Sequence, residues 1–293
     1  MKASSLKKAF TLAITFIFIG TLPIVAQIGG RGPGKNTTKR LADLSHEEAL
    51  TRVQAFRDYR GSGDYLLQFD LIVSGKNQSK KIYHGMLAGT WTHLGPLSRA
   101  DLWQDGINQE HAEHFLFLGG HHPQAWVVHP TGTTEAQLIP TEDFNLPLLP
   151  ELPYTIYDFL MPFMYWDHLD YQGHKQIKGR PAYLFRMHPP TAYQQFISYV
   201  DVALDASYNA LIKTTTFDQN KKAETTSELI SFKKIDSEWM VKTLDFTHEK
   251  KKTKVRFELK AAAMRLDLQP DLFEPASLHQ TIVVPYTISL TYF

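Results

Sequence analysis

The chain has 293 residues, of which 43% are hydrophobic and 12% aromatic, so it is long enough to bury a substantial core. Its 31 basic and 30 acidic residues give a formal net charge of +1, and this balance argues against a nucleic-acid partner. The chain contains no cysteine, which excludes disulfide bridges and a lipid attached to a cysteine side chain.

The first 26 residues have the order of a cleavable signal peptide. A basic start precedes the apolar stretch 9–20, and Ala26 offers a small residue at the predicted cleavage point. The alternative is a membrane anchor, but this stretch is shorter than the roughly 20 residues that a spanning helix needs. We therefore expect an exported protein that begins near Gln27, with a flexible segment over 27–44. The length of 45–293 fits one large all-β domain or two small ones, and we interpret it as a single β domain.

A helix and several strands follow this segment. Ser45 and Glu48 form a capping-box pattern, and an apolar stripe that includes Val53 extends the predicted helix to about Tyr59. Alternating apolar and polar residues then predict strands. The predicted strands are 64–74 paired with 80–91, a strand at 98–103, and 114–118 paired with 124–129.

The β pattern breaks in the middle of the chain. Residues 146–153 are rich in leucine and proline, and Thr155 with Asp158 has the pattern of a second helix cap. The aromatic stretch 157–166 then predicts a short helix that Pro162 interrupts. This helix is either a lid over a cavity or a helix packed permanently in the core. As a lid it would use Phe159, Leu160, Phe163 and Trp166.

Strands resume at Lys175 and continue to about Leu268, with a loose edge strand expected over 282–292. The clearest strand is 252–260, where charged residues alternate with apolar ones because successive side chains point to opposite faces. Arg256 lies on the expected wet face. The residues expected to point inward are Val255, Phe257, Leu259, Tyr183, Phe185 and Met187. Several such strands form a curved sheet whose apolar inner face must be covered by helices or by a ligand.

A series of short motifs in this half of the chain resembles the outer-membrane lipoprotein-sorting (LolA/LolB-like) superfamily, as a divergent branch. The motifs are Gly179-Arg180 before a strand at 183–186, the segment 199–205, the strand 211–218, Glu238-Trp239, and the closing 271–275. The resemblance covers the C-terminal half well and the N-terminal half in outline. It implies a mainly β fold: an incomplete, strongly curved antiparallel β-barrel covered by short helices, with the helix at 45–59 lying across the open side.

Catalytic and metal-binding motifs are absent from the sequence. The 13 histidines include His111 and His114, but an odd separation on a strand places side chains on opposite faces, so we expect no metal site. There is no Gly-x-Ser-x-Gly elbow, although His168 between acidic neighbours leaves a hydrolytic use open. The lysines at 233–234 and 250–252 are solvated turns or, alternatively, a patch that docks on an anionic membrane.

The resemblance implies a periplasmic carrier that binds acyl chains of lipids or lipoproteins and uses no cofactor. The expected ligand-binding residues are Phe159, Leu160, Phe163, Trp166, Tyr183, Phe185, Val255, Phe257 and Leu259. We expect a monomer that is not an enzyme, and envelope membrane proteins remain open as further partners. Two alternatives stand: a cell-envelope structural or interaction protein whose β core is filled by its own side chains, and an exported enzyme.

Overall fold

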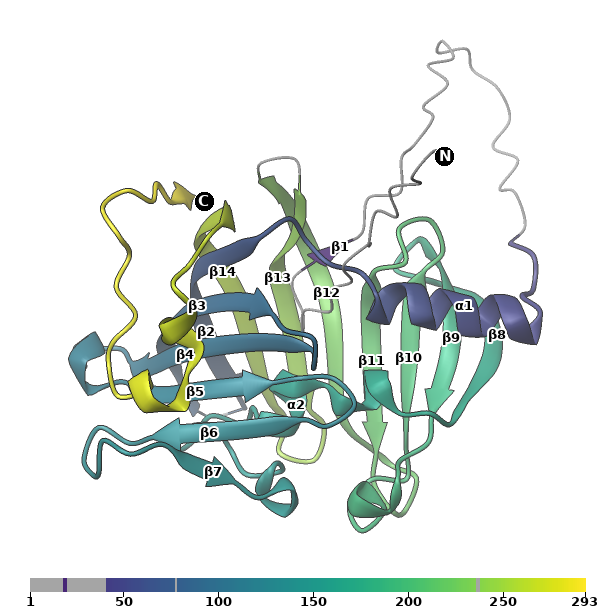
Figure 1. Cartoon of the computed structure of the whole chain (residues 1–293). Helices are drawn as coiled ribbons and strands as arrows, with labels where there is room; N and C mark the ends of the chain where they lie inside the picture. The colour runs from purple at the N-terminus through teal and green to yellow at the C-terminus, as the bar shows by residue number, and fades with distance from the viewer. Residues whose placement is uncertain (1–17, 20–40, 77, 236–237) are drawn as a thin grey trace, which may run out of the picture.

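The computed structural model describes residues 18–19, 41–76, 78–235 and 238–293 (Figure 1). Most of the predicted leader and of the segment 27–44 lies outside the described residues. The strands are β1 (Phe18–Ile19), β2 (Asp64–Gly75), β3 (Gln78–Trp91), β4 (Pro96–Gln104), β5 (Glu113–Leu118), β6 (Gln124–Val128), β7 (Gln137–Ile139), β8 (Leu169–Ile177), β9 (Arg180–Met187), β10 (Tyr199–Asp205), β11 (Leu211–Phe217), β12 (Ala223–Ile235), β13 (Glu238–His248), β14 (Thr253–Leu266) and β15 (Thr291–Tyr292). The helices are α1 (His46–Arg57) and α2 (Ile156–Leu160), with 3-10 turns η1 (Gln109–His111), η2 (Thr141–Asp143), η3 (Pro162–Tyr165), η4 (Thr191–Tyr193), η5 (Pro270–Phe273) and η6 (Pro275–Ser277).

The strands form one antiparallel sheet that bends strongly and does not close. Its order runs β7-β6-β5-β4-β3-β2-β14-β13-β12-β11-β10-β9-β8, so β7 and β8 are its two edges. The central pair β14–β2 joins segments about two hundred residues apart in sequence, as in Leu259 beside Phe69. The prediction of a mainly β, incomplete, strongly curved antiparallel barrel with short helices is therefore confirmed.

The inner face of the sheet carries the main core. On β14, Val255 and Leu259 are buried and Phe257 packs against the core, as alternation predicted. Tyr183 and Phe185 on β9 are also buried in this cluster. The outer face was predicted to carry solvated charged side chains, but Arg256 there pairs with a buried carboxylate.

Arg256 lies on the outer face of β14, but it is not a free solvated side chain. Its Nε and Nη2 donate to the two carboxylate oxygens of the buried Asp245 at 2.7 and 2.9 Å, and Lys254 pairs with the same carboxylate. This two-bond ion pair lowers the pKa of Asp245, although burial acts against it. A charge reversal at Arg256 would therefore not be innocuous.

The C-terminal segment 267–290 covers the outer face of the β2–β6 part of the sheet (Figure 1). Two buried charged residues of β4 hold it there. Arg99 donates to the carbonyl oxygens of Leu272 and Leu278, and Asp101 accepts the backbone N–H of Ile282 at 2.6 Å and pairs with His114. The expected edge strand over 282–292 is reduced to β15, which pairs with β14.

Helix α1 begins at the predicted capping box, where Ser45 and Glu48 satisfy each other's backbone N–H groups. The helix lies over β8–β11 (Figure 1). Arg52 bonds to Asn209 and stacks on Tyr183, while Arg57 donates to two carbonyl oxygens, including that of Trp166. α1 thus ties this part of the sheet to the chain that leaves η3.

Strands β8 and β7 depart most from the predictions. β8 begins at Leu169, six residues before the expected start, because the polar residues around Gly173 mask the strand pattern. β7 was not predicted, since it has three residues, all exposed or half-buried, and so presents no alternation to read.

Candidate functional site

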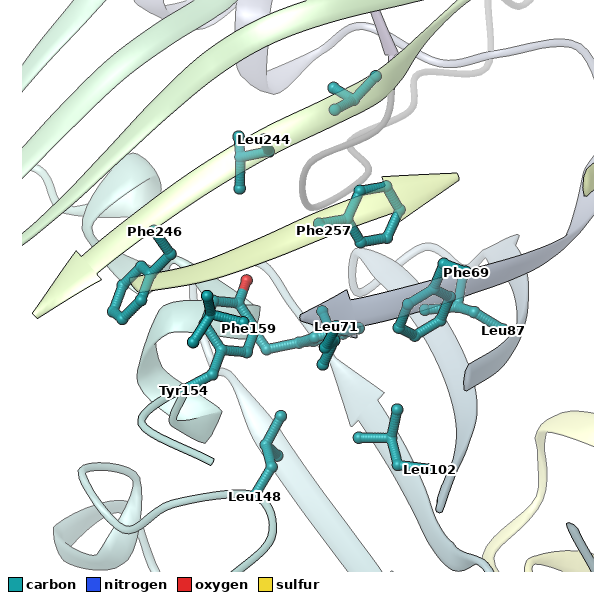
Figure 2. Close-up of a pocket in the computed structure, with 12 residues that line it drawn as sticks. Phe69, Leu71, Leu87, Leu102, Leu148, Tyr154, Phe159, Leu244, Phe246 and Phe257 are labelled. Atoms are coloured by element: carbon teal, nitrogen blue, oxygen red, sulfur yellow. The ribbon is translucent and has the colours of Figure 1, made fainter. Parts of the chain in front are cut away.

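An apolar pocket of ≈ 50 Å³ lies on the inner face of the sheet, beneath α2 (Figure 2). Its lining comes from five strands and from the segment around α2. None of the lining residues carries a charge. They are Phe69, Leu71, Leu87, Leu102, Leu148, Tyr154, Phe159, Val241, Leu244, Phe246, Val255 and Phe257. The site can therefore hold an apolar group and offers it no ionic partner.

A glycine shapes one wall of this pocket. Phe69 on β2 stands opposite Gly85 on β3, and its ring lies directly over the glycine backbone. A Cβ at Gly85 would stand 2.2 Å from that ring, so any larger residue would displace it. On its other side Phe69 stacks on Phe257, with ring centroids 5.1 Å apart. The cross-strand arrangement thus turns two aromatic rings into the pocket wall.

The other wall is the lid segment, residues 147–160, which ends with α2. A capping box starts α2: the Thr155 Oγ accepts from the Asp158 N–H, and the Asp158 carboxylate accepts from the Thr155 N–H and hydroxyl. The helix stops at Met161, which adopts a left-handed φ of 43°. Pro162 then opens η3. The interruption that Pro162 predicted in the helix over 157–166 is therefore present: α2 ends at Leu160, and the 3-10 turn η3 begins at the proline.

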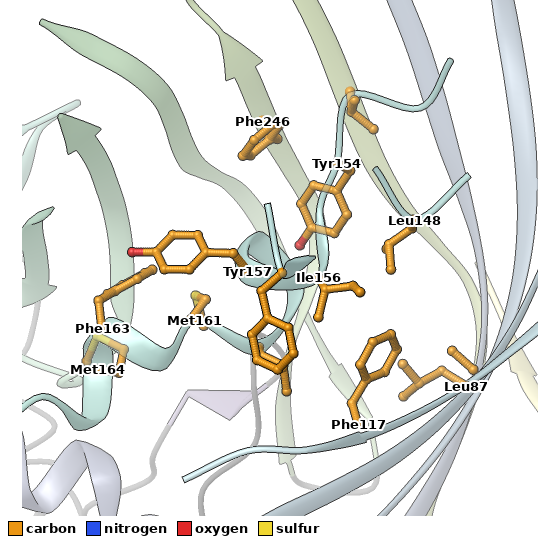
Figure 3. Close-up of a cluster of buried hydrophobic side chains, with 14 of the residues drawn as sticks. Leu87, Phe117, Leu148, Tyr154, Ile156, Tyr157, Met161, Phe163, Met164 and Phe246 are labelled. Atoms are coloured by element: carbon orange, nitrogen blue, oxygen red, sulfur yellow. The ribbon is translucent and has the colours of Figure 1, made fainter. Parts of the chain in front are cut away.

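Aromatic contacts hold the lid segment against the sheet (Figure 3). Phe159 stacks on Phe117 with centroids 4.3 Å apart, and Tyr154 meets Phe246 edge-on at 5.1 Å. Phe159 is only half-buried, whereas Tyr154 is buried and its hydroxyl reaches the Asp158 carbonyl oxygen. The lid segment therefore closes the pocket by packing and not by charged groups.

Asp158 has an unusual setting for a carboxyl group. It lies buried in α2, and burial raises its pKa to about 7, against which the two Thr155 hydrogen bonds act. The nearby Glu224 raises it further. The Asp158 carboxyl group, which caps α2, therefore has a pKa near neutral pH.

The predicted ligand-binding residues divide into three groups. Phe159, Val255 and Phe257 line the pocket. Leu160, Phe163 and Trp166 pack elsewhere in the core, with Trp166 against Tyr193 at 5.5 Å. Another set, Tyr183, Phe185 and Leu259, is buried in the core and does not line the pocket. The binding role of all nine residues stays a prediction.

Nine lining residues were missed by the sequence analysis. Phe69 and Leu71 had a usable signal, because they alternate with polar residues along β2. The β13 residues Leu244 and Phe246 follow the same rule. Leu148 had only the leucine- and proline-rich composition of its segment, which does not fix where a side chain points.

Five histidines in the described part of the chain pair with carboxylates, namely His84, His114, His129, His174 and His188. His114 bonds to Asp101 at 2.8 Å and His188 to Asp170 at 2.7 Å. Across residues 18–19, 41–76, 78–235 and 238–293, no three potential ligands gather in a metal-binding arrangement. A search of the same residues finds no helix with both the length and the hydropathy to span a membrane.

Comparison with known proteins places the fold. An outer membrane lipoprotein-sorting protein domain from Vibrio parahaemolyticus aligns over 79% of this chain and 97% of its own, with TM-score 0.66 and 14% identity. A DUF1329 family protein from Desulfovibrio piger gives a TM-score of 0.62 at 13% identity, over 78% of this chain and 95% of that one. A LolA superfamily protein from Nitrosomonas europaea gives 0.58 at 12%, over 79% and 98%.

Sequence comparison adds no closer relative: no family model matches the chain, and no curated protein matches it. The structural likenesses at 12–14% identity fit the divergent branch that the motifs indicated. The chain has the fold of the outer-membrane lipoprotein-sorting (LolA-like) superfamily.

Proposed function

We propose that this protein is a periplasmic, non-catalytic carrier that takes an acyl chain of a lipid or lipoprotein into the pocket beneath α2. The observation that supports this function is the lining: every residue around the pocket is apolar or aromatic, and no charged group needs to be satisfied. Transfer of one methylene out of water is worth roughly 0.8 kcal/mol, so a long acyl chain contributes on the order of 10 kcal/mol. A pocket of this composition needs no polar contact to bind such a chain.

The volume of the pocket sets how binding would proceed. At ≈ 50 Å³ the pocket is smaller than the engineered cavity of about 150 Å³ that holds a benzene molecule. An acyl chain therefore enters only if side chains leave. Leu148, Tyr154 and Phe159 all belong to the lid segment, so one movement of that segment would withdraw three of the lining side chains together.

Two features favour that movement over a rearrangement of the sheet. The lid segment contributes no strand to the sheet; the isolated β-bridge between Pro147 and Thr155 joins two of its own residues. The left-handed Met161 separates α2 from η3, which Arg57 anchors to α1 through the Met164 carbonyl oxygen. We propose that α2 swings about Met161 while η3 stays in place.

The alternative function is a structural or interaction protein of the cell envelope. The same small volume supports it, because a pocket of ≈ 50 Å³ describes a core that the chain fills with its own side chains. Under this alternative Phe159 never leaves Phe117, and the apolar lining is ordinary core.

Native mass spectrometry of the mature protein, purified from the envelope without detergent, distinguishes the two functions. The carrier predicts mass increments of a lipid, or increments that form on incubation with palmitate. A second sample carries Gly85→Ala, which pushes Phe69 toward the pocket and should reduce the bound fraction. Unliganded protein alone, even after incubation with excess palmitate, would reject the carrier and leave the self-filled core.

A further inference from the structure

A second pocket, of ≈ 370 Å³, lies on the other side of the lid segment; its lining mixes apolar with polar and charged residues, and we name it the polar pocket because the first pocket has no charged residue. Tyr154 and Phe159 face the apolar pocket, whereas Thr155, Tyr157 and Asp158 line the polar one. The lid segment thus separates the two pockets, with Tyr154 and Phe159 on one side of it and Thr155, Tyr157 and Asp158 on the other. The remaining lining residues are Asn145, Pro147, Pro153, Phe196, Ile197, Thr216, Glu224, Thr225, His248, Lys250 and Lys251.

The same strand runs through both pockets. Leu244 and Phe246 of β13 line the apolar pocket, and His248, two residues farther along the strand, lines the polar one. Residues two apart point to the same face and lie about 7 Å apart. A group held at His248 therefore has its first few methylenes beside Phe246 and the next beside Leu244.

The charges of the polar pocket favour an anion at its mouth. Lys250 is held by Asp218 at 2.9 Å and by Glu224 at 3.4 Å. In the part of the chain that the structure describes, Lys251 has no carboxylate within ion-pairing distance. Its backbone N–H points to the His248 Nδ1 at 3.5 Å, so the two side chains belong to one turn.

The pocket's two carboxyl groups do not cancel this preference. Glu224 is engaged by Lys250, and Asp158 accepts the hydroxyl and N–H of Thr155. Of the two pocket lysines, Lys251 is the one to which the described residues offer no ionic partner, and it is exposed at the β13–β14 turn.

We propose that the polar pocket receives the anionic head group, a phosphate or a carboxylate, of an amphiphile whose acyl chain occupies the apolar pocket. Lys251 and His248 contact the head, and β13 carries the chain from His248 to Phe246 and Leu244 once the lid segment has moved. The proposal rests on the proposed carrier function and names the class of its cargo. It also assigns Lys251 a role other than that of a solvated turn residue.

The experiment compares three amphiphiles with the same twelve-carbon chain: dodecyl phosphate, neutral dodecanol and cationic dodecyltrimethylammonium. Each is titrated, below its micelle concentration, against the mature protein loaded with the neutral fluorescent probe N-phenyl-1-naphthylamine. Dodecyl phosphate should displace the probe with an affinity about tenfold higher than dodecanol, because a charge-assisted hydrogen bond is worth that factor. Lys251→Glu should abolish the difference in affinity between dodecyl phosphate and dodecanol. The control Lys234→Glu, at an exposed position of β12, should keep that difference.

The outcomes separate the two proposals. Equal affinities for dodecyl phosphate and dodecanol, or a preference that survives Lys251→Glu, would overturn the head-group assignment and leave the carrier intact. Failure of all three amphiphiles to bind would overturn the carrier and this inference with it.

A thermal-shift measurement separates an amphiphile from free phosphate: dodecyl phosphate should raise Tm and inorganic phosphate should not. A Tm rise with inorganic phosphate that Lys251→Glu removes would make the pocket a free-phosphate site and overturn the amphiphile.

Discussion

Replacement of Asp158 by asparagine tests the lid helix through its buried cap. An asparagine keeps a side-chain oxygen that can accept the Thr155 N–H, so the capping box survives in part. It cannot ionise. The variant therefore removes the charge that α2 carries at high pH while it leaves the shape of the side chain almost unchanged.

The magnitude follows from the pKa of the group. Burial raises the pKa of Asp158 from its usual 3.8 to about 7, and each pKa unit corresponds to 1.36 kcal/mol. Between these two values the folded state binds more protons than the unfolded state. The free energy of unfolding therefore falls as pH rises from about 4 to about 7, by up to about 4 kcal/mol, and levels off above. Asp158→Asn should lack this loss.

Urea unfolding of both proteins at pH 4.5 and pH 8, followed by tryptophan fluorescence, measures the effect. We expect similar stabilities at pH 4.5 and a variant that is more stable than the parent at pH 8. Asp271→Asn, at an exposed carboxyl of η5, is the control and should shift neither value. The same difference between Asp158→Asn and the parent at both pH values would refute the reasoning, because the buried carboxyl would then not be protonated in the folded state.

Three other variants test the packing. Phe257→Glu should lower the free energy of unfolding by at least about 3 kcal/mol, since it buries a carboxylate in an apolar wall. The control Lys234→Glu, at an exposed position, should change the free energy of unfolding little. Equal urea midpoints for the two variants would contradict the inward orientation of Phe257 on β14. Phe159→Ala should enlarge the pocket and tighten binding of p-xylene measured by calorimetry, and unchanged binding would show that the space collapses. Asp101→Asn should cost about 3 kcal/mol and expose the segment 267–290 to limited proteolysis. An undigested segment would show that the Asp101 carboxylate does not hold it.

The sequence predicted those parts of the fold that depend on neighbouring residues. The capping boxes at Ser45 and Thr155 were readable because a cap involves residues three apart. The inward parity of β14 was readable because alternation is a property of one strand. The curved sheet followed from several such strands in series.

The candidate site was only partly predictable, because it is assembled over long distances in the sequence. Phe69 and Phe257 meet because β2 pairs with β14, and no local pattern states that pairing. Met161 shows another limit: Pro162 indicated that the helix breaks here, but nothing in the sequence indicated that the residue before it is left-handed. Arg256 shows a third, since a charged residue on an outer face can still hold a buried partner.

The most direct test of the carrier is to locate a bound acyl chain. A fatty acid with a diazirine at its chain end, photolysed in complex with the mature protein, labels the residues next to the terminal methyl group, and peptide mass spectrometry identifies them. We expect label on the pocket residues of β2 and β14, such as Leu71, Val255 and Phe257, and competition by unlabelled palmitate. Label confined to the outer-face segment 267–290, or labelling that palmitate does not reduce, would contradict it.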